Sequence, residues 1–599
     1  MNKVCGITGE LRFDGAAADR QLVAAMAERL AHRGPDDSGL HSDGPVALGH
    51  RRLSVIDLSA RAHQPMLDAA SGCAIVFNGA IYNYPQLRET LIALGHRFTS
   101  SGDTEVILRA YLQWGSGCVA RFNGMFAFAI WDARERSLFM ARDRMGIKPL
   151  YYSHGNKALR FASSLTALLA AEDIDRSIDP AGLHHQFTLH GVVPAPRTLL
   201  KGVRKLRPAH WRRVHLDGRI EEQCYWQLSA RRGVARSERE WTEAVHDALR
   251  LAVKRRLDIA DVPVGVLLSG GLDSSLLVGL LAEAGVGDLK TFTVGFEDQP
   301  EEKGSEFEYS DPVAERFATE HHKFHVPDEQ LISRLPEAIE KMAEPMFGQD
   351  AVAFYLLSER VSKEVKVVQS GQGADEVFAG YFWYPQMHAA QKAAGNRETM
   401  LETFASRYFD RSHAEWLEAV DPAHHSGDAT AELIAELLAG QDADEYLDRV
   451  LAMDVTTLIV DDPVKRVDNM TMAWGLEARV PFLDHELVEL AMQLPTELKL
   501  REGGKGPLKA IARGLLPDSV IDRSKGYFPV PALKFVRGEV LDFMRDIVNS
   551  KACRERGLYG RGYIERLLAA PDAEENFTRL RGSKLWHAAL LELWLQTHL

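Results

Sequence analysis

The sequence predicts an α/β protein of two domains, residues 1–215 and 241–599, joined by a linker at residues 216–240. Its 599 residues, 46% of them hydrophobic, exceed the size at which a single core stops growing. Short apolar strands separated by turns fill the first part of the chain, which favours layered sheets with helices outside. Farther on, a β-branched run breaks at two glycines and continues as an apolar helix, as is typical of a doubly wound parallel sheet.

A series of short motifs marks the N-terminal domain: CGITGELRF, RGPD, HRRLSVID, IVFNGAIYNY and SGDTEVIL. This set resembles the class II glutamine amidotransferase domain, whose fold is an Ntn-type α-β-β-α glutaminase sandwich and whose nucleophile is an N-terminal cysteine. The resemblance implies that Cys5 attacks the carboxamide of glutamine, while Asn78 and Gly79 bind it and form the oxyanion hole. It also implies that Arg52 binds the glutamine carboxylate and that Asp103 binds its ammonium group.

Two positions depart from the pattern of that family. The family sequence NGE reads NGA here, with Ala80 in place of the glutamate, so Asp103 alone carries the charge near the ammonium group. In the family the α-amine of the cysteine is the base that takes the proton of its thiol. The pKa of an α-amine, about 8, is close to that of a thiol, about 8.5, so this proton transfer costs little free energy. Four residues precede Cys5, and they would convert that amine into an amide. We therefore expect that Val4 is a misread GUG start codon or that a short leader is removed.

The predicted linker, residues 216–240, follows a stretch in which the apolar pattern loosens. It contains the charged segment RRGVARSERE and leads into a helix. Charge runs of this kind are usually solvated surface, so we assign no binding to it.

The stretch from Val262 to Ser275, VPVGVLLSGGLDSS, predicts a strand, a glycine turn and the start of a helix. Paired glycines let the backbone approach phosphate oxygens, and the free N–H groups of a helix N-terminus point at negative charge. Asp273 would repel a phosphate unless Mg²⁺ joined the two, so the turn predicts a nucleotide loop with a metal ligand. The pattern resembles the pyrophosphate loop of the ATP pyrophosphatases, which adenylate a substrate. The resemblance implies ATP or pyrophosphate contacts from Leu268, Ser269, Gly270, Gly271, Asp273, Ser274, Val294, Ser370 and Gly371.

A second glycine-rich turn follows another apolar strand, in VKVVQSGQGADEVFAGY. Its Asp375 can lie beside Asp273, and we expect the two carboxylates to bind one Mg²⁺ ion. With the N-terminal domain, the C-terminal helices resemble the asparagine synthetase family over nearly the whole chain. By that resemblance Lys509 contacts the α-phosphate of ATP and stabilises the charge that develops as pyrophosphate leaves. The expected cofactors are therefore ATP and Mg²⁺.

The identity of the acceptor carboxylate depends on this second turn. Asparagine synthetases have SGEG there, whereas this chain has Gln372 at the third position. A neutral glutamine cannot accept a proton or face the α-ammonium group of free aspartate as a glutamate does. Together with ELRFDG, VVPAPRT and GYFPVPALK, Gln372 resembles the branch that amidates the capped dipeptide N-acetylglutaminylglutamine to make an osmoprotectant. We favour that acceptor, with free aspartate as the alternative.

A reading from a different class is a glutaminase or binding protein that has lost the synthetase reaction. Such a protein would release no pyrophosphate from ATP. Asp273, Asp375 and Lys509 are all present, which argues against it.

Composition excludes several other classes of function. The net charge of −13 and the absence of a Lys/Arg block argue against nucleic acid as a partner. Five cysteines without a CxxC pair are typical of a reduced, cytosolic protein. With neither a signal segment nor an apolar run long enough to span a bilayer, we expect a soluble, cytoplasmic enzyme without a membrane partner. Its partners are then glutamine, ATP and the carboxylate acceptor, and the family resemblance implies a homodimer.

Overall fold

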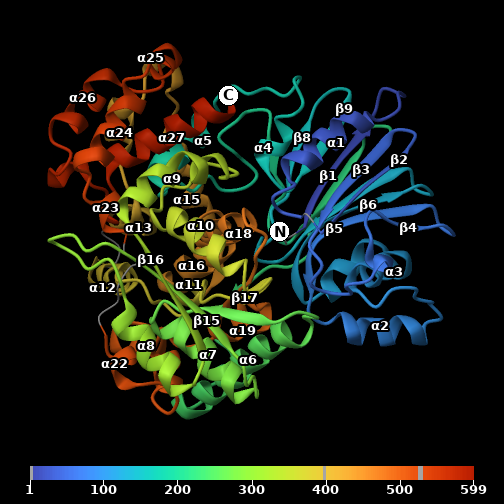
Figure 1. Ribbon diagram of the computed structural model, residues 1–599, viewed down its shortest axis with the longest axis horizontal. Coiled ribbons are helices and arrows are strands. Elements are labelled where there is room, and N and C mark those ends of the chain that lie inside the picture. Colours follow the sequence, from blue (N-terminus) through green and yellow to red (C-terminus); the bar gives the residue numbers. More distant parts are fainter. Residues whose placement is uncertain (1–4, 35, 395–398, 524–529) are drawn as a thin grey trace.

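The structure is a computed structural model, and it describes residues 5–34, 36–394, 399–523 and 530–599. A β-rich N-terminal domain lies beside a larger C-terminal domain made of a parallel sheet and many helices (Figure 1). The expectation that Val4 is the first residue lies outside the described residues, as does part of the GYFPVPALK motif.

Two six-stranded antiparallel sheets form the N-terminal domain. Their strand orders are β10-β8-β9-β1-β3-β2 and β12-β11-β7-β6-β5-β4. Apolar side chains such as Ile7 and Val76 fill the space between them, and α1 and α3 pack on the outer faces. The predicted α-β-β-α sandwich is therefore confirmed. Its elements are β1 (Gly6–Arg12), α1 (Arg20–Arg29), β2 (Asp37–Asp43), β3 (Val46–Arg52), β4 (Met66–Asp68), β5 (Cys73–Ile81), α2 (Tyr84–Ala93), α3 (Asp103–Trp114), β6 (Gly124–Asp132), β7 (Ser137–Arg142), β8 (Tyr151–His154), β9 (Ala158–Ala162), β10 (Arg204–Lys205), β11 (His210–His215) and β12 (Ile220–Cys224).

The predicted linker begins with regular structure. Its residues Ile220–Cys224 form β12, which pairs with β11 at the edge of the second sheet. The remaining part leads into the long helix α6 (Glu238–Asp258), whose first turn is closed by a capping box between Ser237 and Glu240.

A five-stranded parallel sheet forms the centre of the C-terminal domain, in the order β16-β15-β14-β17-β19. The chain runs from β14 outwards to β16 and then crosses to the other side of β14, so the strand order reverses between β14 and β17. Ligands of open parallel sheets bind at such a switch point, outside the carboxyl ends of the strands. The strands are β14 (Val264–Leu267), β15 (Lys290–Phe296), β16 (Glu320–Val326), β17 (Val367–Gln369) and β19 (Glu477–Arg479).

Helices cover both faces of this sheet, as predicted for a doubly wound fold. In the view of Figure 1, α6 and α7 lie below the sheet, while α10 and α18 lie above it. The helices nearest the sheet are α7 (Leu272–Glu283), α8 (Phe307–Arg316), α10 (Asp350–Val361), α11 (Ala374–Val377), α18 (Pro463–Met472), α19 (His485–Met492) and α21 (Gly506–Ala512). The outer helices are α9 (Asp328–Glu340), α12 (Trp383–Ala394), α13 (Met400–Tyr408), α14 (His413–Ala419), α15 (Ala429–Gly440), α16 (Tyr446–Met453), α24 (Gly538–Val548), α25 (Lys551–Arg556), α26 (Arg561–Ala569) and α27 (Lys584–His598).

Among the described residues, no helix has both the length and the apolar character needed to cross a bilayer.

Candidate functional site

A cavity of about 800 Å³ opens at the switch point between β14 and β17. This volume is within the range of small-molecule and cofactor sites, about 300–1,000 Å³. Of the residues predicted to contact ATP, pyrophosphate, metal or acceptor, all except Gly270 line it: Leu268, Ser269, Gly271, Asp273, Ser274, Val294, Ser370, Gly371, Gln372, Asp375 and Lys509.

The first glycine turn is held in shape by its own serines. The Ser269 and Ser274 hydroxyls lie 3.1 Å apart, and the backbone N–H of Ser269 donates to Ser274 Oγ at 3.2 Å. Gly271 is the N-cap of α7, no side chain caps that helix, and the residues of its first turn line the cavity. The N–H groups of a first turn have no partner within their helix. The turn therefore presents a prearranged set of donors for an anion.

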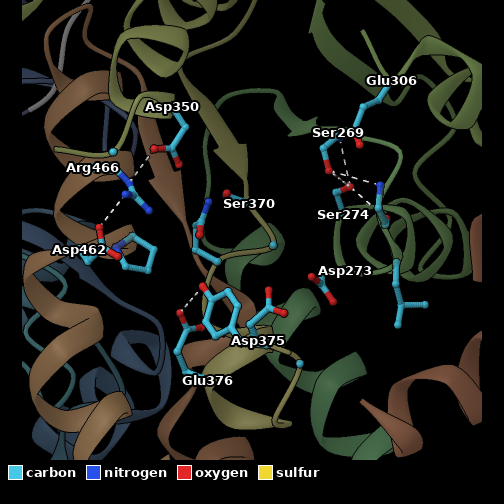
Figure 2. Close-up of a pocket in the computed structure, with 18 of the residues that line it drawn as sticks. Ser269, Asp273, Ser274, Glu306, Asp350, Ser370, Asp375, Glu376, Asp462 and Arg466 are labelled. Carbon is cyan, nitrogen blue, oxygen red and sulfur yellow. Dashed lines mark hydrogen bonds and ion pairs between the residues drawn. The ribbon is translucent and has the colours of Figure 1, made fainter. Parts of the chain in front are cut away.

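The second glycine turn approaches the first closely. A Cβ atom on Gly371 would lie only 3.0 Å from the Cβ of Asp273, so a larger residue at this position would push the turns apart. Figure 2 shows the carboxylates of Asp273 and Asp375 facing the same gap between the turns.

A lysine lies between these two carboxylates. Lys505 Nζ is 2.6 Å from Asp273 Oδ2 and 2.8 Å from Asp375 Oδ1. Although burial works against the charged form, the two carboxylates raise the pKa of Lys505 above its usual value. Lys505 has a left-handed backbone, with φ of 59°, at the N-cap of α21. Such a conformation is uncommon for a residue with a side chain, and it is often found at functional sites.

The donor set at this gap fits a magnesium ion. Mg²⁺ prefers carboxylate oxygens and phosphate oxygens as ligands, and a single cationic group already lies within ion-pair distance of both Asp273 and Asp375. The two carboxylates thus converge on one position, as a shared metal site requires.

Lys509 also lines the cavity, one helical turn after Lys505. Its ammonium group donates to the backbone carbonyl of Glu502, and burial lowers its pKa. From the sequence, Lys509 was expected to contact the α-phosphate, and Lys505, which the structure places at both carboxylates, was not identified. The available signal was the glycine-rich turn GGKG, which allows the backbone conformation that brings Lys505 to the carboxylates.

The wall of the cavity that lies on the far side of Ser370 from the first glycine turn is charged. Arg466 pairs with two carboxylates there: its Nε is 3.2 Å from Asp350 Oδ1, and its Nη1 is 2.6 Å from Asp462 Oδ1. Figure 2 places these three side chains on the opposite side of Ser370 from Ser269 and Ser274. The nucleotide loop and this wall therefore bound different parts of one cavity.

A second constellation lies in the N-terminal domain, around Cys5. Cys5 immediately precedes β1, and its Sγ accepts from the backbone N–H of Leu53 at 3.4 Å. Burial raises the pKa of the Cys5 thiol to about 11, and the negative charge of Glu477 adds to this rise. The thiol is therefore protonated at neutral pH, and a base must remove its proton before it can attack a carbon atom.

Asn78 has the properties of an oxyanion-hole residue. It lies in β5 and is fully buried, yet neither Nδ2 nor Oδ1 has a hydrogen-bond partner within the part of the chain that the structure describes. A buried amide without a partner costs about 1–3 kcal/mol, which a bound ligand can recover. Gly79, the next residue, pairs with Phe126 of β6.

Arg52 and Asp103 are each held by backbone groups. Arg52 ends β3 and donates to the carbonyls of Ser59, at 3.2 Å, and of Asp57, so no carboxylate in these contacts neutralises its charge. Asp103 begins α3 and accepts from the N–H of Ile81 at 3.0 Å, two residues beyond Gly79. Burial raises the pKa of Asp103 to about 7.

The C-terminal domain contributes to this second site. Glu477 of β19 is buried, and its Oε1 forms an ion pair with Arg479 Nε at 2.7 Å. The negative charge of Glu477 raises the pKa of both Cys5 and Asp103. Sequence reasoning did not identify Glu477, because nothing local to LEARVPFLD indicates that this strand reaches the other domain.

Comparison with known proteins gives consistent matches over the chain. The asparagine synthase family matches residues 244–596, and the glutamine amidotransferase domain family matches residues 4–226. Asparagine synthetase (glutamine-hydrolysing) 3 of Bacillus subtilis (strain 168) is 32% identical over 94% of this chain and 93% of the relative. Asparagine synthetase (glutamine-hydrolysing) 1 of the same organism is 32% identical over 99% of this chain and 96% of the relative. A plant relative, asparagine synthetase (glutamine-hydrolysing) 2 of Oryza sativa subsp. japonica, is 29% identical over 88% of this chain and 75% of the relative.

Proposed function

The chain belongs to the asparagine synthetase family, and because its second glycine turn carries the neutral Gln372 we propose that it amidates N-acetylglutaminylglutamine rather than free aspartate. It is a glutamine-dependent amidotransferase of the asparagine synthetase type, with ATP as a substrate. We further propose the roles of individual residues in the two reactions and the identity of the acceptor.

In the synthetase cavity, the acceptor carboxylate attacks the α-phosphate of ATP and pyrophosphate leaves. The donors of the Ser269–Ser274 turn bind the pyrophosphate oxygens, and Lys509 contacts the α-phosphate. Lys505 adds a second cation at the two carboxylates and stabilises the departing charge. Asp273 and Asp375 would hold Mg²⁺, which supplies further charge neutralisation when bound.

In the N-terminal domain, the α-amine of Cys5, freed by removal of the preceding residues, takes the proton of the thiol, and the thiolate attacks the carboxamide of glutamine. The Asn78 amide and the N–H of Gly79 donate to the oxygen that becomes negative in the tetrahedral intermediate. Arg52 binds the substrate carboxylate and Asp103 its ammonium group. The released ammonia then attacks the acyl-adenylate in the other domain. Water must be kept away from both the ammonia and the acyl-adenylate. Ammonia in water at neutral pH is mostly protonated, and the adenylate is easily hydrolysed.

Gln372 is the observation that carries the acceptor assignment. It lines the cavity in the turn between the nucleotide loop and the charged wall of Arg466, Asp350 and Asp462. Because its side chain is neutral, it supplies no carboxylate for the α-ammonium group of free aspartate. An acceptor whose amine is capped has no such group, and its amide groups can bond to the donors and acceptors of the charged wall.

Free aspartate is the second candidate acceptor. The relatives named above are asparagine synthetases, and Asp350 and Asp462 offer carboxylates to an ammonium group while Arg466 offers a cation to a carboxylate. Pyrophosphate release with each acceptor, using ammonium as the nitrogen source, distinguishes the two. The homodimer and the cytoplasmic location belong to this proposal as well, and light scattering of the purified chain tests the first.

A further inference from the structure

A buried ion cluster joins the two domains next to the glutaminase nucleophile. Asp468 Oδ2 lies 2.9 Å from Arg33 Nη2, and Asp468 Oδ1 lies 2.9 Å from Lys148 Nζ. Arg33 and Lys148 belong to the N-terminal domain and are only 1% and 0% exposed, whereas Asp468 lies on α18 of the C-terminal domain and is 5% exposed. The carboxylate of Asp468 is thus shared by two cations that have little access to water.

Arg33 connects this cluster to the nucleophile. Its Nε donates to the backbone carbonyl of Cys5 at 3.3 Å, while its Nη2 is the atom bound to Asp468. A planar guanidinium held at both ends is fixed in direction as well as in position. The residue whose thiol must attack glutamine is therefore held by a carboxylate from the synthetase domain.

The same helix also reaches the synthetase cavity. Arg466, two residues before Asp468, forms part of the charged wall of that cavity with Asp462. A displacement of α18 would therefore move groups at both sites.

We propose that Asp468 is a positioning residue for the glutaminase reaction, acting through Arg33 on the backbone of Cys5. The inference rests on the proposed role of Cys5 as nucleophile. When Asp468 is absent, Arg33 loses its charged partner and the Cys5 backbone loses a fixed donor. A displacement of about 1 Å at a reacting group can lower a rate by about 100-fold. The loss should appear in kcat for glutamine hydrolysis, because Asp468 does not contact the groups proposed to bind glutamine.

The test compares two variants, one that keeps the bond between Arg33 and Asp468 and one that lacks it. Removing Asp468 alone would leave two buried cations unpaired and could prevent folding. Lys148→Met alone keeps the bond between Arg33 and Asp468. The double variant Asp468→Leu/Lys148→Met breaks that bond and has the same net cluster charge as the wild type. Asp461→Asn is a further control, since Asp461 pairs with Lys205 across the same domain interface, at 2.9 Å.

Two activities are measured on each full-length variant: glutamate formation from glutamine, and pyrophosphate release with ammonium as the nitrogen source. We expect the double variant to lose about tenfold or more in kcat for glutamate formation relative to Lys148→Met, with KM for glutamine little changed. Its ammonium-dependent pyrophosphate release should stay within about threefold of that of Lys148→Met, and Asp461→Asn should keep the wild-type ratio of the two activities.

Equal glutamate formation in the double variant and Lys148→Met would overturn the proposal. So would a parallel loss of both activities, because that pattern reports damage to the whole fold. If the wild type released no pyrophosphate with any acceptor, the proposed synthetase function would fail, while glutamate formation would still decide the role of Asp468.

Discussion

Lys505 and Asp273 form an ion pair of 2.6 Å although 232 residues separate them in the chain. The pair joins the first glycine turn, at the end of β14, to the start of α21, and the same ammonium group reaches Asp375 in the second glycine turn. Three segments that are remote in sequence thereby share one charged centre, where pyrophosphate would leave.

Replacing Lys505 with methionine keeps the length of the side chain and removes its charge. We expect kcat for ammonium-dependent pyrophosphate release to fall by about 100-fold, the usual cost of losing one group that stabilises transition-state charge. Arg501→Met is the matched control, because Arg501 lies four residues before Lys505 but is 50% exposed and pairs with Glu238, and neither of these residues lines the cavity. A Lys505→Met enzyme within about threefold of Arg501→Met would contradict this role.

Gly380 is required by the closeness of this centre. A Cβ atom there would lie 2.2 Å from Cε of Lys505 and 2.3 Å from Oδ1 of Asp375. Gly380→Ala should therefore displace the lysine and a proposed metal ligand, lowering pyrophosphate release by about tenfold or more. Glutamine hydrolysis should be unaffected.

Gly440→Ala provides the control for this substitution, since a Cβ atom at Gly440, at the end of α15, meets no other atom within 4 Å. If both alanine variants released pyrophosphate at the wild-type rate, the crowding at Gly380 would have no functional meaning.

The affinity for glutamine should depend on pH through Asp103. Burial raises the pKa of Asp103 to about 7. In its proposed role, Asp103 binds the glutamine ammonium group as the ionised carboxylate. As the pH falls below about 7, the free enzyme is increasingly protonated at Asp103, so KM for glutamine should rise by about tenfold per pH unit. Above that pH it should level off.

Steady-state glutaminase kinetics from pH 5.5 to 8.5 measure this dependence. The KM for ATP in the ammonium-dependent reaction serves as the internal comparison. Asp103→Asn should have a high KM for glutamine that varies little over the same range, and an unchanged pH profile in that variant would assign the titration to another group.

The sequence predicted those features that local patterns determine. The alternation of apolar strands and turns indicated the sandwich, and the strand–glycine–helix pattern indicated the turn between β14 and α7 that holds Ser269 and leads to Asp273. Asp375 was placed beside Asp273 because the carboxyl ends of parallel strands meet at one edge of a sheet.

Features that depend on tertiary contacts were missed for a physical reason. Lys505 reaches the carboxylates only because its backbone is left-handed and a glycine lies opposite, and neither fact follows from the spacing of lysines on a helix. Arg33 and Asp468 are 435 residues apart, so no local pattern could pair them. Glu477 belongs to one domain and acts electrostatically on the site of the other.

The most direct test of the account is ATP-dependent pyrophosphate release with ammonium as the nitrogen source, compared between N-acetylglutaminylglutamine and free aspartate. Ammonium bypasses the glutaminase site, so the result depends only on the synthetase cavity and its acceptor. We expect release with the capped dipeptide and little with aspartate, and we expect Gln372→Glu to shift the preference towards aspartate. Efficient release with aspartate and none with the dipeptide would contradict the proposed acceptor and identify an asparagine synthetase that functions with a neutral Gln372.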